Sequence, residues 1–269
     1  MKLAEGSSHE AWQPFTPRGV AAFANAAFRR VLLVQLIFAA LAGIAVTTFL
    51  ASAWFPTVSD AIQKLPDQGY IRGGQLVYTA ESPRLLASSS WLSITVDLPQ
   101  GQTYRTGSDV QAEFSSKSVR FISLAGYWDT PYPSGWIIAF NQPELGSWWN
   151  AWEPFLAAGA GLIFAVGLMG LWAFLALIYG IPAGVICRFV EHDIHWRAVW
   201  KLCCAGQLPG SLLMSFTLLL YSLRAIDLVQ WLFVFVAHVV VGWVYIFLST
   251  FFIPRTDRKR SRKPNPFGG

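Results

Sequence analysis

The sequence has few charged residues. Asp, Glu, Lys and Arg make up 13% of its 269 residues, about half the share that a soluble globular domain carries. A shortage of this size argues against a water-soluble protein and predicts apolar runs of bilayer length, about 20 residues for a helix. Such runs are present, and they define the organisation of the chain.

Three apolar runs contain no Asp, Glu, Lys or Arg and are long enough to span a bilayer: 31–55, 202–223 and 228–254. A fourth uncharged run, 154–187, would be about 51 Å long as a helix, too long for one upright span and too short for two. We interpret it as one helix that is broken near Gly180–Pro182. The pattern therefore predicts about four transmembrane helices.

Basic residues are distributed unevenly between the segments outside these runs. Segments 1–30, 188–201 and 255–269 hold most of the Lys and Arg, whereas the longer segment 56–153 holds few. By the positive-inside rule, this bias predicts cytoplasmic N- and C-termini at a bacterial plasma (inner) membrane and an extracytoplasmic segment 56–153. Ala51-Ser52-Ala53 resembles a signal-peptidase site, but the preceding run is longer than a signal h-region, so we expect an uncleaved anchor.

Segment 56–153 is long enough to fold by itself in water. Its first ten residues have the spacing of a short amphipathic helix, and Gly73-Gly74 predicts a hairpin turn between apolar runs. Residues 91–96 alternate as a strand does, and two more strand-like runs flank Ser115–Ser118. The fold class predicted is a membrane α-helical bundle with a small α+β, β-rich extracytoplasmic domain, formed by an antiparallel sheet and one helix, between the first two spans.

This segment lacks cysteine and histidine, which excludes disulfides and leaves no obvious active site. Its acids are spread among basic residues, and we interpret them as solvated charges at sheet edges. They are Asp97, Asp109, Glu113 and Asp129.

The stretch "RFVEHDIHWRAVWKLCC", residues 188–204, is the most chemically crowded part of the chain. Thiols and imidazoles are preferred zinc ligands, but the paired C-x2-C and H-x3-H units of zinc sites are absent. We therefore interpret 188–201 as an amphipathic cytoplasmic loop and expect no metal and no cofactor. The weak metal candidates are Cys187, His192, His195 and Cys203.

The connector "HDIHWRAVWKL" followed by "CCAGQLPGSLLMSF" resembles the Yip-type superfamily of multi-pass membrane proteins. The front half is similar to a bacterial branch that includes a protein linked to maltodextrin utilisation. The resemblance implies a non-enzymatic membrane protein and supplies no catalytic residue. Relatives commonly have five spans, whereas four are predicted here. The similar residues are Pro14–Phe23, Leu65-Pro66, Ile71, Gly74, Leu76 and Ile94–Asp97.

Polar groups at membrane depth are candidates for function. They indicate either a transport path or hydrogen bonds between helices, and we favour the hydrogen bonds. The candidates are His238, Gln207, Gln35 and Gln230.

Small residues and a proline predict close helix packing, in the bundle or in a dimer, at Gly159, Gly167, Gly170, Pro209 and Gly242. Tryptophans predict anchors at the membrane surface: Trp148, Trp149 and Trp152. In the short turn 224–227, we expect Arg224 and Asp227 to cap helix ends.

The tail 255–269 is basic and has no hydrophobic stripe. Arg255–Lys263 predicts attraction to anionic lipids, and nothing in its composition supports nucleic-acid binding.

The leading hypothesis is a non-enzymatic multi-pass protein that acts as a scaffold, assembly subunit or sensor through its extracytoplasmic domain, with a protein partner or as a homo-oligomer. A transporter, or a transporter accessory subunit, that uses polar groups of the last two spans is the alternative. An envelope- or lipid-modifying enzyme is a further alternative.

Overall fold

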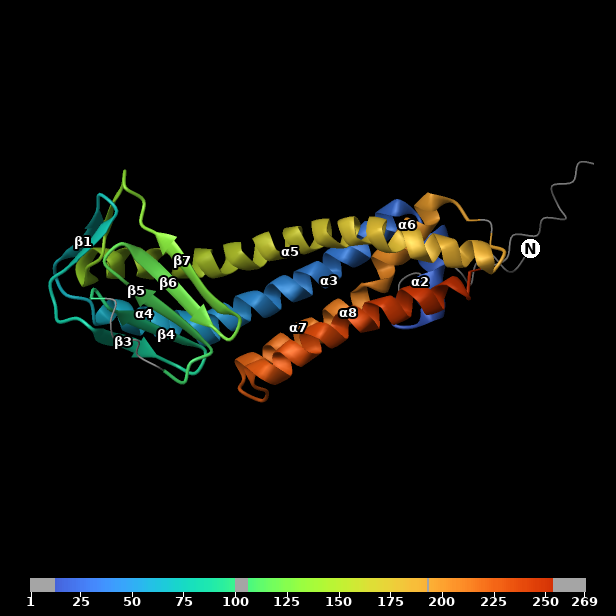
Figure 1. Ribbon diagram of the computed structural model, residues 1–269. Coiled ribbons are helices and arrows are strands. Elements are labelled where there is room, and N and C mark those ends of the chain that lie inside the picture. Colours follow the sequence, from blue (N-terminus) through green and yellow to red (C-terminus); the bar gives the residue numbers. More distant parts are fainter. Residues whose placement is uncertain (1–12, 100–105, 193, 254–269) are drawn as a thin grey trace, which may run out of the picture. The chain divides into compact units, whose positions relative to one another are not determined.

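The structure is a computed structural model that describes residues 13–99, 106–192 and 194–253 (Figure 1). The chain divides into two compact units. The first, here called the helical unit, comprises 1–45, 162–218 and 229–269. The second, here called the β unit, comprises 46–161 and 219–228. The tail 255–269, with its predicted lipid contacts, lies outside the described residues.

Four helical segments in the described part of the chain are long and apolar enough to cross a membrane: Phe28–Gln63, Gln142–Phe189, Trp196–Ser222 and Leu228–Thr250. The β-rich segment lies between the first and second of them. The predicted bundle of four apolar helices with a β-rich insert between the first two is therefore confirmed, and the chain is a multi-pass membrane protein in contact with the lipid bilayer.

The first span is longer than predicted. Helix α3 (Phe28–Phe49) continues through a π-helical segment, η2 (Leu50–Trp54), into α4 (Phe55–Gln63). The amphipathic helix expected at the start of segment 56–153 is therefore the end of the first long helix.

The predicted break near Gly180–Pro182 is wrong. Helix α5 runs without interruption from Gln142 to Phe189. Pro182 removes one backbone donor, but an apolar environment offers the remaining backbone groups no partners except those of the helix itself. The helix begins at Gln142 because the Asn141 side chain accepts a hydrogen bond from the Glu144 N–H at 3.0 Å, as an N-cap does.

The predicted loop 188–201 is mostly helical. Helix α6 (Trp196–Gly206) begins directly after a short turn that follows α5, and α7 (Leu208–Ser222) continues it after an interruption at Gln207. The third span is therefore two helices, because Pro209 has no N–H to donate to the preceding turn. Helix α8 (Leu228–Thr250) is the fourth span.

Glycines bring α6 and α7 close to α8 in the helical unit. A Cβ at Gly210 would lie 2.5 Å from the backbone oxygen of His238, and one at Gly206 would overlap Ile246. Gly242 faces them from α8. Gly206 and Gly210 are four residues apart, the spacing of small residues at close helix crossings in membranes.

Gly242 was also predicted for helix packing and lies at this contact, whereas the three glycines predicted in α5 lie elsewhere. A Cβ at Gly159, Gly167 or Gly170 would meet nothing within 4 Å among the described residues. Their expected place at a close contact within the bundle is therefore wrong, and a dimer contact stays a prediction. Composition alone did not distinguish the face of α5 that carries them from the packed faces of α6 and α7.

The N-terminal part of the helical unit also packs into its core. Helix α2 (Pro17–Ala22) begins at Thr16, whose hydroxyl accepts from the Gly19 N–H at 3.0 Å, and η1 (Phe23–Asn25) follows it. Val20 and Phe23 are fully buried in the same cluster as Leu202.

The β unit contains two sheets, not the single one expected. The first has the order β2-β1-β8, formed by β1 (Gly69–Arg72), β2 (Gln75–Tyr78) and β8 (Ile137–Ala139). The hairpin predicted at Gly73-Gly74 is confirmed, with φ values of 60° and 76° that favour glycine.

The second sheet has the order β3-β4-β5-β6-β7. The expectation of an antiparallel sheet is wrong at one place, because β4 and β5 pair in parallel. Residues 97–109 connect them, long enough to return the chain to the start of β4. The strands are β3 (Arg84–Ser88), β4 (Leu92–Val96), β5 (Val110–Phe114), β6 (Ser118–Ser123) and β7 (Gly126–Pro131).

Candidate functional site

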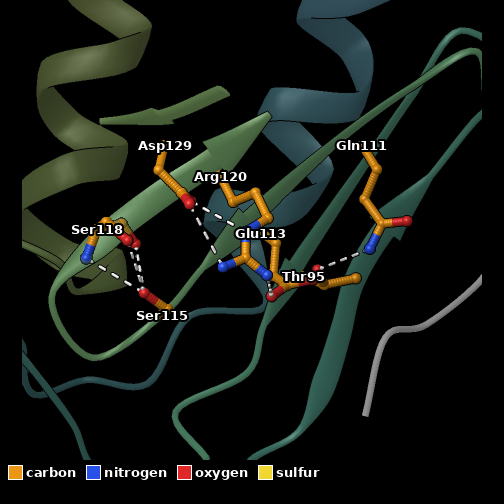
Figure 2. Close-up of polar contacts among 7 residues, drawn as sticks. All are labelled: Thr95, Gln111, Glu113, Ser115, Ser118, Arg120 and Asp129. Atoms are coloured by element: carbon orange, nitrogen blue, oxygen red, sulfur yellow. Dashed lines mark hydrogen bonds and ion pairs between the residues drawn. The ribbon is translucent and has the colours of Figure 1, made fainter. Parts of the chain in front are cut away.

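The five-stranded sheet has one apolar face and one polar face. Ile94, Val96 and Ala112 belong to the apolar core that Ala61 of α4 and nearby Leu65 also enter. Because side chains alternate along a strand, their neighbours lie on the opposite face. These are Ser93 and Thr95 on β4 and Gln111 and Glu113 on β5, and all four are buried. Figure 2 shows Thr95, Gln111 and Glu113.

Glu113 is the ionisable residue among these four. Its residue is only 2% exposed. Its Oε1 lies 3.9 Å from Nη1 of Arg120, whereas its Oε2 is buried without a hydrogen-bond partner. Burial raises the pKa of Glu113; attraction by Arg120 opposes the rise, and repulsion by Asp97 and Asp129 adds to it.

Arg120 is bound mainly to Asp129 rather than to Glu113. Its Nε donates to Asp129 Oδ1 at 2.9 Å and its Nη2 to Oδ2 at 3.4 Å, a two-pronged contact across β6 and β7 (Figure 2). The hydrogen bond to Asp129 raises the pKa of Arg120. Glu113 therefore shares a cation that Asp129 already binds.

Other polar groups on β4 and β5 and at the β5–β6 turn form hydrogen bonds with one another or with nearby backbone groups. The Gln111 amide donates to the Thr95 hydroxyl at 3.5 Å. At the β5–β6 turn, the Ser115 hydroxyl donates to the Ser118 carbonyl at 2.8 Å and accepts from its N–H at 3.2 Å. Tyr132 donates to the Ser115 carbonyl at 3.0 Å, and burial raises the pKa of Tyr132.

The interpretation of the acids as solvated charges is wrong for two of them. Asp97 and Glu113 are each 2% exposed. The sequence does indicate that these polar residues share one face, because Ser93, Thr95 and Asp97 occupy every second position of an otherwise apolar strand. Sequence alone did not show that the face they occupy would be buried.

A pH-dependent stability follows from Glu113. The folded pKa is raised above the unfolded one, so the folded state binds the proton more tightly. Tighter proton binding by the folded state stabilises the fold. This stabilisation is complete below the pKa of Glu113 in the unfolded chain and is lost as pH rises through its pKa in the folded protein. We expect Glu113→Gln to gain stability relative to the unchanged protein as pH rises from 4 to 7, which urea unfolding followed by tryptophan fluorescence measures. A constant difference across this range would contradict the assignment.

A second group of contacts joins the starts of β4 and β5 to the turn between α7 and α8. The Trp91 indole donates to the Tyr221 carbonyl at 3.2 Å, and the Tyr221 hydroxyl donates to Asp109 Oδ2 at 2.6 Å. The Arg224 guanidinium lies 4.2 Å from the centroid of the Trp91 ring. We call these four residues the turn contact.

The turn contact changes the interpretation of Arg224. Its φ is 61°, in the left-handed region, and its side chain lies against Trp91. The helix end is satisfied instead by backbone bonds, including one from Ala225 N–H to the Leu220 carbonyl at 3.0 Å. Arg224 therefore caps the end of α7 through its backbone, as predicted: its N–H donates to the Tyr221 carbonyl at 3.1 Å, whereas its side chain lies against Trp91.

The metal candidates are not assembled into a site. Within residues 13–99, 106–192 and 194–253, no group of three His, Cys, Asp or Glu could hold a metal ion. Both ring nitrogens of His192 lie at hydrogen-bond distance from backbone carbonyls, those of Val190 and Ile253. Cys187 and Cys203 are buried free thiols, and His195 stands at the start of α6.

Two of the four polar candidates at membrane depth, Gln207 and His238, contact backbone carbonyls. Gln207 Nε2 donates to the Trp172 carbonyl of α5 and to the Cys203 carbonyl of α6, each at 3.1 Å. The His238 ring contacts the Phe235 carbonyl of its own helix. Gln35 is buried, and its Nε2 donates to no oxygen or nitrogen atom among the described residues.

Gln230 is exposed at the start of α8. The hydrogen bonds that the structure shows for Gln207 and His238 go to backbone carbonyls and not to another of these candidates.

The three tryptophans at the start of α5 differ from one another. Trp149 is buried, donates to the Ser59 hydroxyl at 2.8 Å and meets Phe55 edge-on at 5.0 Å. It joins α5 to α4. Trp148 and Trp152 are about half exposed, and their role as anchors at the membrane surface stays a prediction.

Comparisons with known proteins found no match to a protein-family model, to a curated protein or to a solved structure. The function is therefore argued from the residues of this chain.

Proposed function

We propose that the protein is a non-enzymatic membrane sensor that recognises a ligand or partner through its β-rich segment 56–153, here called the β domain, outside the cytoplasm. The turn contact carries this proposal, because it joins the β domain to the α7–α8 turn by two hydrogen bonds and a cation–π contact. A passive anchor would need only the covalent connections through α4 and α5.

The position of the turn contact in the sequence supports a relay. Trp91 immediately precedes β4 and Asp109 immediately precedes β5. The same two strands carry the buried polar face, and Glu113 lies four residues after Asp109. A change at the polar face that shifts β4 against β5 would therefore act directly on Tyr221.

The buried polar face supplies an element that can hold two states. Glu113 is either ionised beside a shared arginine or protonated and neutral, and burial reduces the cost of the neutral form relative to the charged one. A ligand or partner that binds one state better than the other shifts the equilibrium by its differential affinity. The resemblance to the Yip-type superfamily, which implies a protein without catalytic residues, is compatible with this proposal.

Tyr221→Phe tests the contact on which the relay depends. It removes the hydroxyl that donates to Asp109 and keeps the ring that stacks on Phe49 at 5.5 Å. A hydrogen bond to a charged group contributes about 1.5–3 kcal/mol, so we expect amide hydrogen exchange in residues 219–228 to accelerate about tenfold or more.

The β6–β7 hairpin should exchange at an unchanged rate in the same variant and serves as the internal control. Unchanged exchange at 219–228 would show that the turn is held by other means and would contradict the proposed relay.

A further inference from the structure

The helical unit contains a hollow of about 420 Å³ lined by two aromatic and two basic residues: Phe28, Arg197, Trp200 and Lys201. The rings of Phe28 and Trp200 stack, with centroids 6.0 Å apart and planes inclined by 22°. The hollow therefore combines a flat apolar wall with two positive charges.

Two of these side chains are fixed by hydrogen bonds to backbone carbonyls. Lys201 Nζ donates to Ala26 O at 2.8 Å, which leaves two N–H groups of the ammonium for another acceptor. Trp200 Nε1 donates to Ala173 O at 3.1 Å. The hollow is thus formed before any ligand enters, which lowers the entropic cost of binding.

Among the residues that the structure describes, no ion pair neutralises the positive charge of the hollow. In the described ranges of the structure, neither Arg197 nor Lys201 forms an ion pair. Cations at the edge of a low-dielectric region attract an anion strongly.

The hollow lies at the ends of two spans. Phe28 is the first residue of α3, and the first uncharged run begins three residues later, at Val31. Lys201 immediately precedes the uncharged run 202–223. Tryptophan, lysine and arginine at such positions belong to the headgroup layer of a bilayer. The anion that is concentrated at this depth is the phosphate of a lipid.

We propose that this hollow binds the phosphate group of an anionic phospholipid. Arg197 and Lys201 contact the phosphate oxygens, and the stacked rings of Phe28 and Trp200 contact the glycerol and the first carbons of the acyl chains. Basic pockets between membrane helices bind lipid headgroups in this way. The site is independent of the proposed sensor function and of the basic tail.

Lipid titration of the purified full-length protein, followed by native mass spectrometry, tests the site. The probes are phosphatidylglycerol and phosphatidylcholine with identical acyl chains, and soluble glycerol 3-phosphate. We expect the unchanged protein to retain phosphatidylglycerol in preference to phosphatidylcholine. Each basic residue near the surface contributes about 1 kcal/mol, so Arg197→Gln should weaken phosphatidylglycerol binding about fivefold and Arg197→Gln with Lys201→Gln about thirtyfold.

The matched control is Arg29→Gln with Arg188→Gln, which removes two exposed charges that do not line the hollow. Arg197 is exposed, so its single variant reports on binding even if loss of the Lys201–Ala26 hydrogen bond perturbs folding. An equal loss in the control pair would overturn the site, as would the absence of a preference for phosphatidylglycerol. Binding of glycerol 3-phosphate as tight as that of the lipid would overturn the lipid as the source of the phosphate.

Discussion

Gly210→Leu is expected to destabilise the helical unit by about 3 kcal/mol or more. A Cβ at this position would lie 2.5 Å from the His238 carbonyl oxygen, which is backbone and cannot rotate away. Overpacking of a well-packed interior costs about 1–3 kcal/mol when side chains can adjust, and here a whole helix must move. Unfolding by increasing SDS in mixed micelles measures the loss.

Gly167→Leu is the matched control for this prediction. It makes the same chemical change in a long membrane helix, but its Cβ meets nothing within 4 Å among the described residues. Leucine also has a higher helix propensity than glycine, by roughly 1 kcal/mol. We expect unchanged or slightly higher stability. A loss as large as that of Gly210→Leu would contradict the packing described for α7 and α8, whereas a loss of oligomer mass alone would support the predicted dimer contact.

Two buried glutamines should respond differently to the same substitution: Gln207→Met should lose stability, and Gln35→Met should not. Gln207→Met removes the amide that donates to Trp172 O and Cys203 O, and it leaves the end of α6 without that donor. Hydrogen bonds between membrane helices contribute up to about 1.7 kcal/mol, so we expect a loss of about 1–2 kcal/mol.

Gln35→Met removes a buried amide whose Nε2 donates to no oxygen or nitrogen atom among the described residues and has the Cys204 thiol as a neighbour. Replacing such a group by an apolar one of similar shape is neutral or stabilising. Both variants are compared by thermal unfolding in the same detergent. A loss of stability in Gln35→Met comparable to that of Gln207→Met would show that the two amides are held alike and would contradict this distinction.

The length of the apolar runs and their lack of charged residues predicted the four long helices, because both depend on local composition. Each of the runs 31–55, 202–223 and 228–254 overlaps one of the four long helices. The hairpin at Gly73-Gly74 was predictable for a similar reason, since two adjacent glycines allow the positive φ values of its turn.

The candidate site could not be predicted from the sequence, because it depends on contacts distant in the chain. The turn contact joins Trp91 to residues 130 and more positions away, and no local pattern in "SSSWLSI" indicates it. Glu113 reads as an ordinary charge at the end of a strand until the register places Arg120 beside it and Asp129 beyond. The parallel pairing of β4 with β5 could not be predicted either, since the alternation of residues along a strand does not identify the strand's partner.

Pro209 and the glycines show the limit of reasoning from residue type. The helix α6 ends shortly before Pro209, whereas α5 continues through Pro182. The difference lies in the contacts that form where α6 is interrupted. At Gln207 the side chain supplies a donor to the Cys203 carbonyl and α8 packs closely at Gly206 and Gly210.

The central claim is that the β domain and the α7–α8 turn are coupled through Tyr221. Hydrogen exchange of the full-length protein in nanodiscs, compared between the unchanged chain and Glu113→Gln, tests it most directly. The account predicts that Glu113→Gln changes exchange both in β4–β5 and in residues 219–228, and that adding Tyr221→Phe abolishes the response of 219–228 to Glu113→Gln. A response in β4–β5 with none at 219–228 in the single variant would contradict the account.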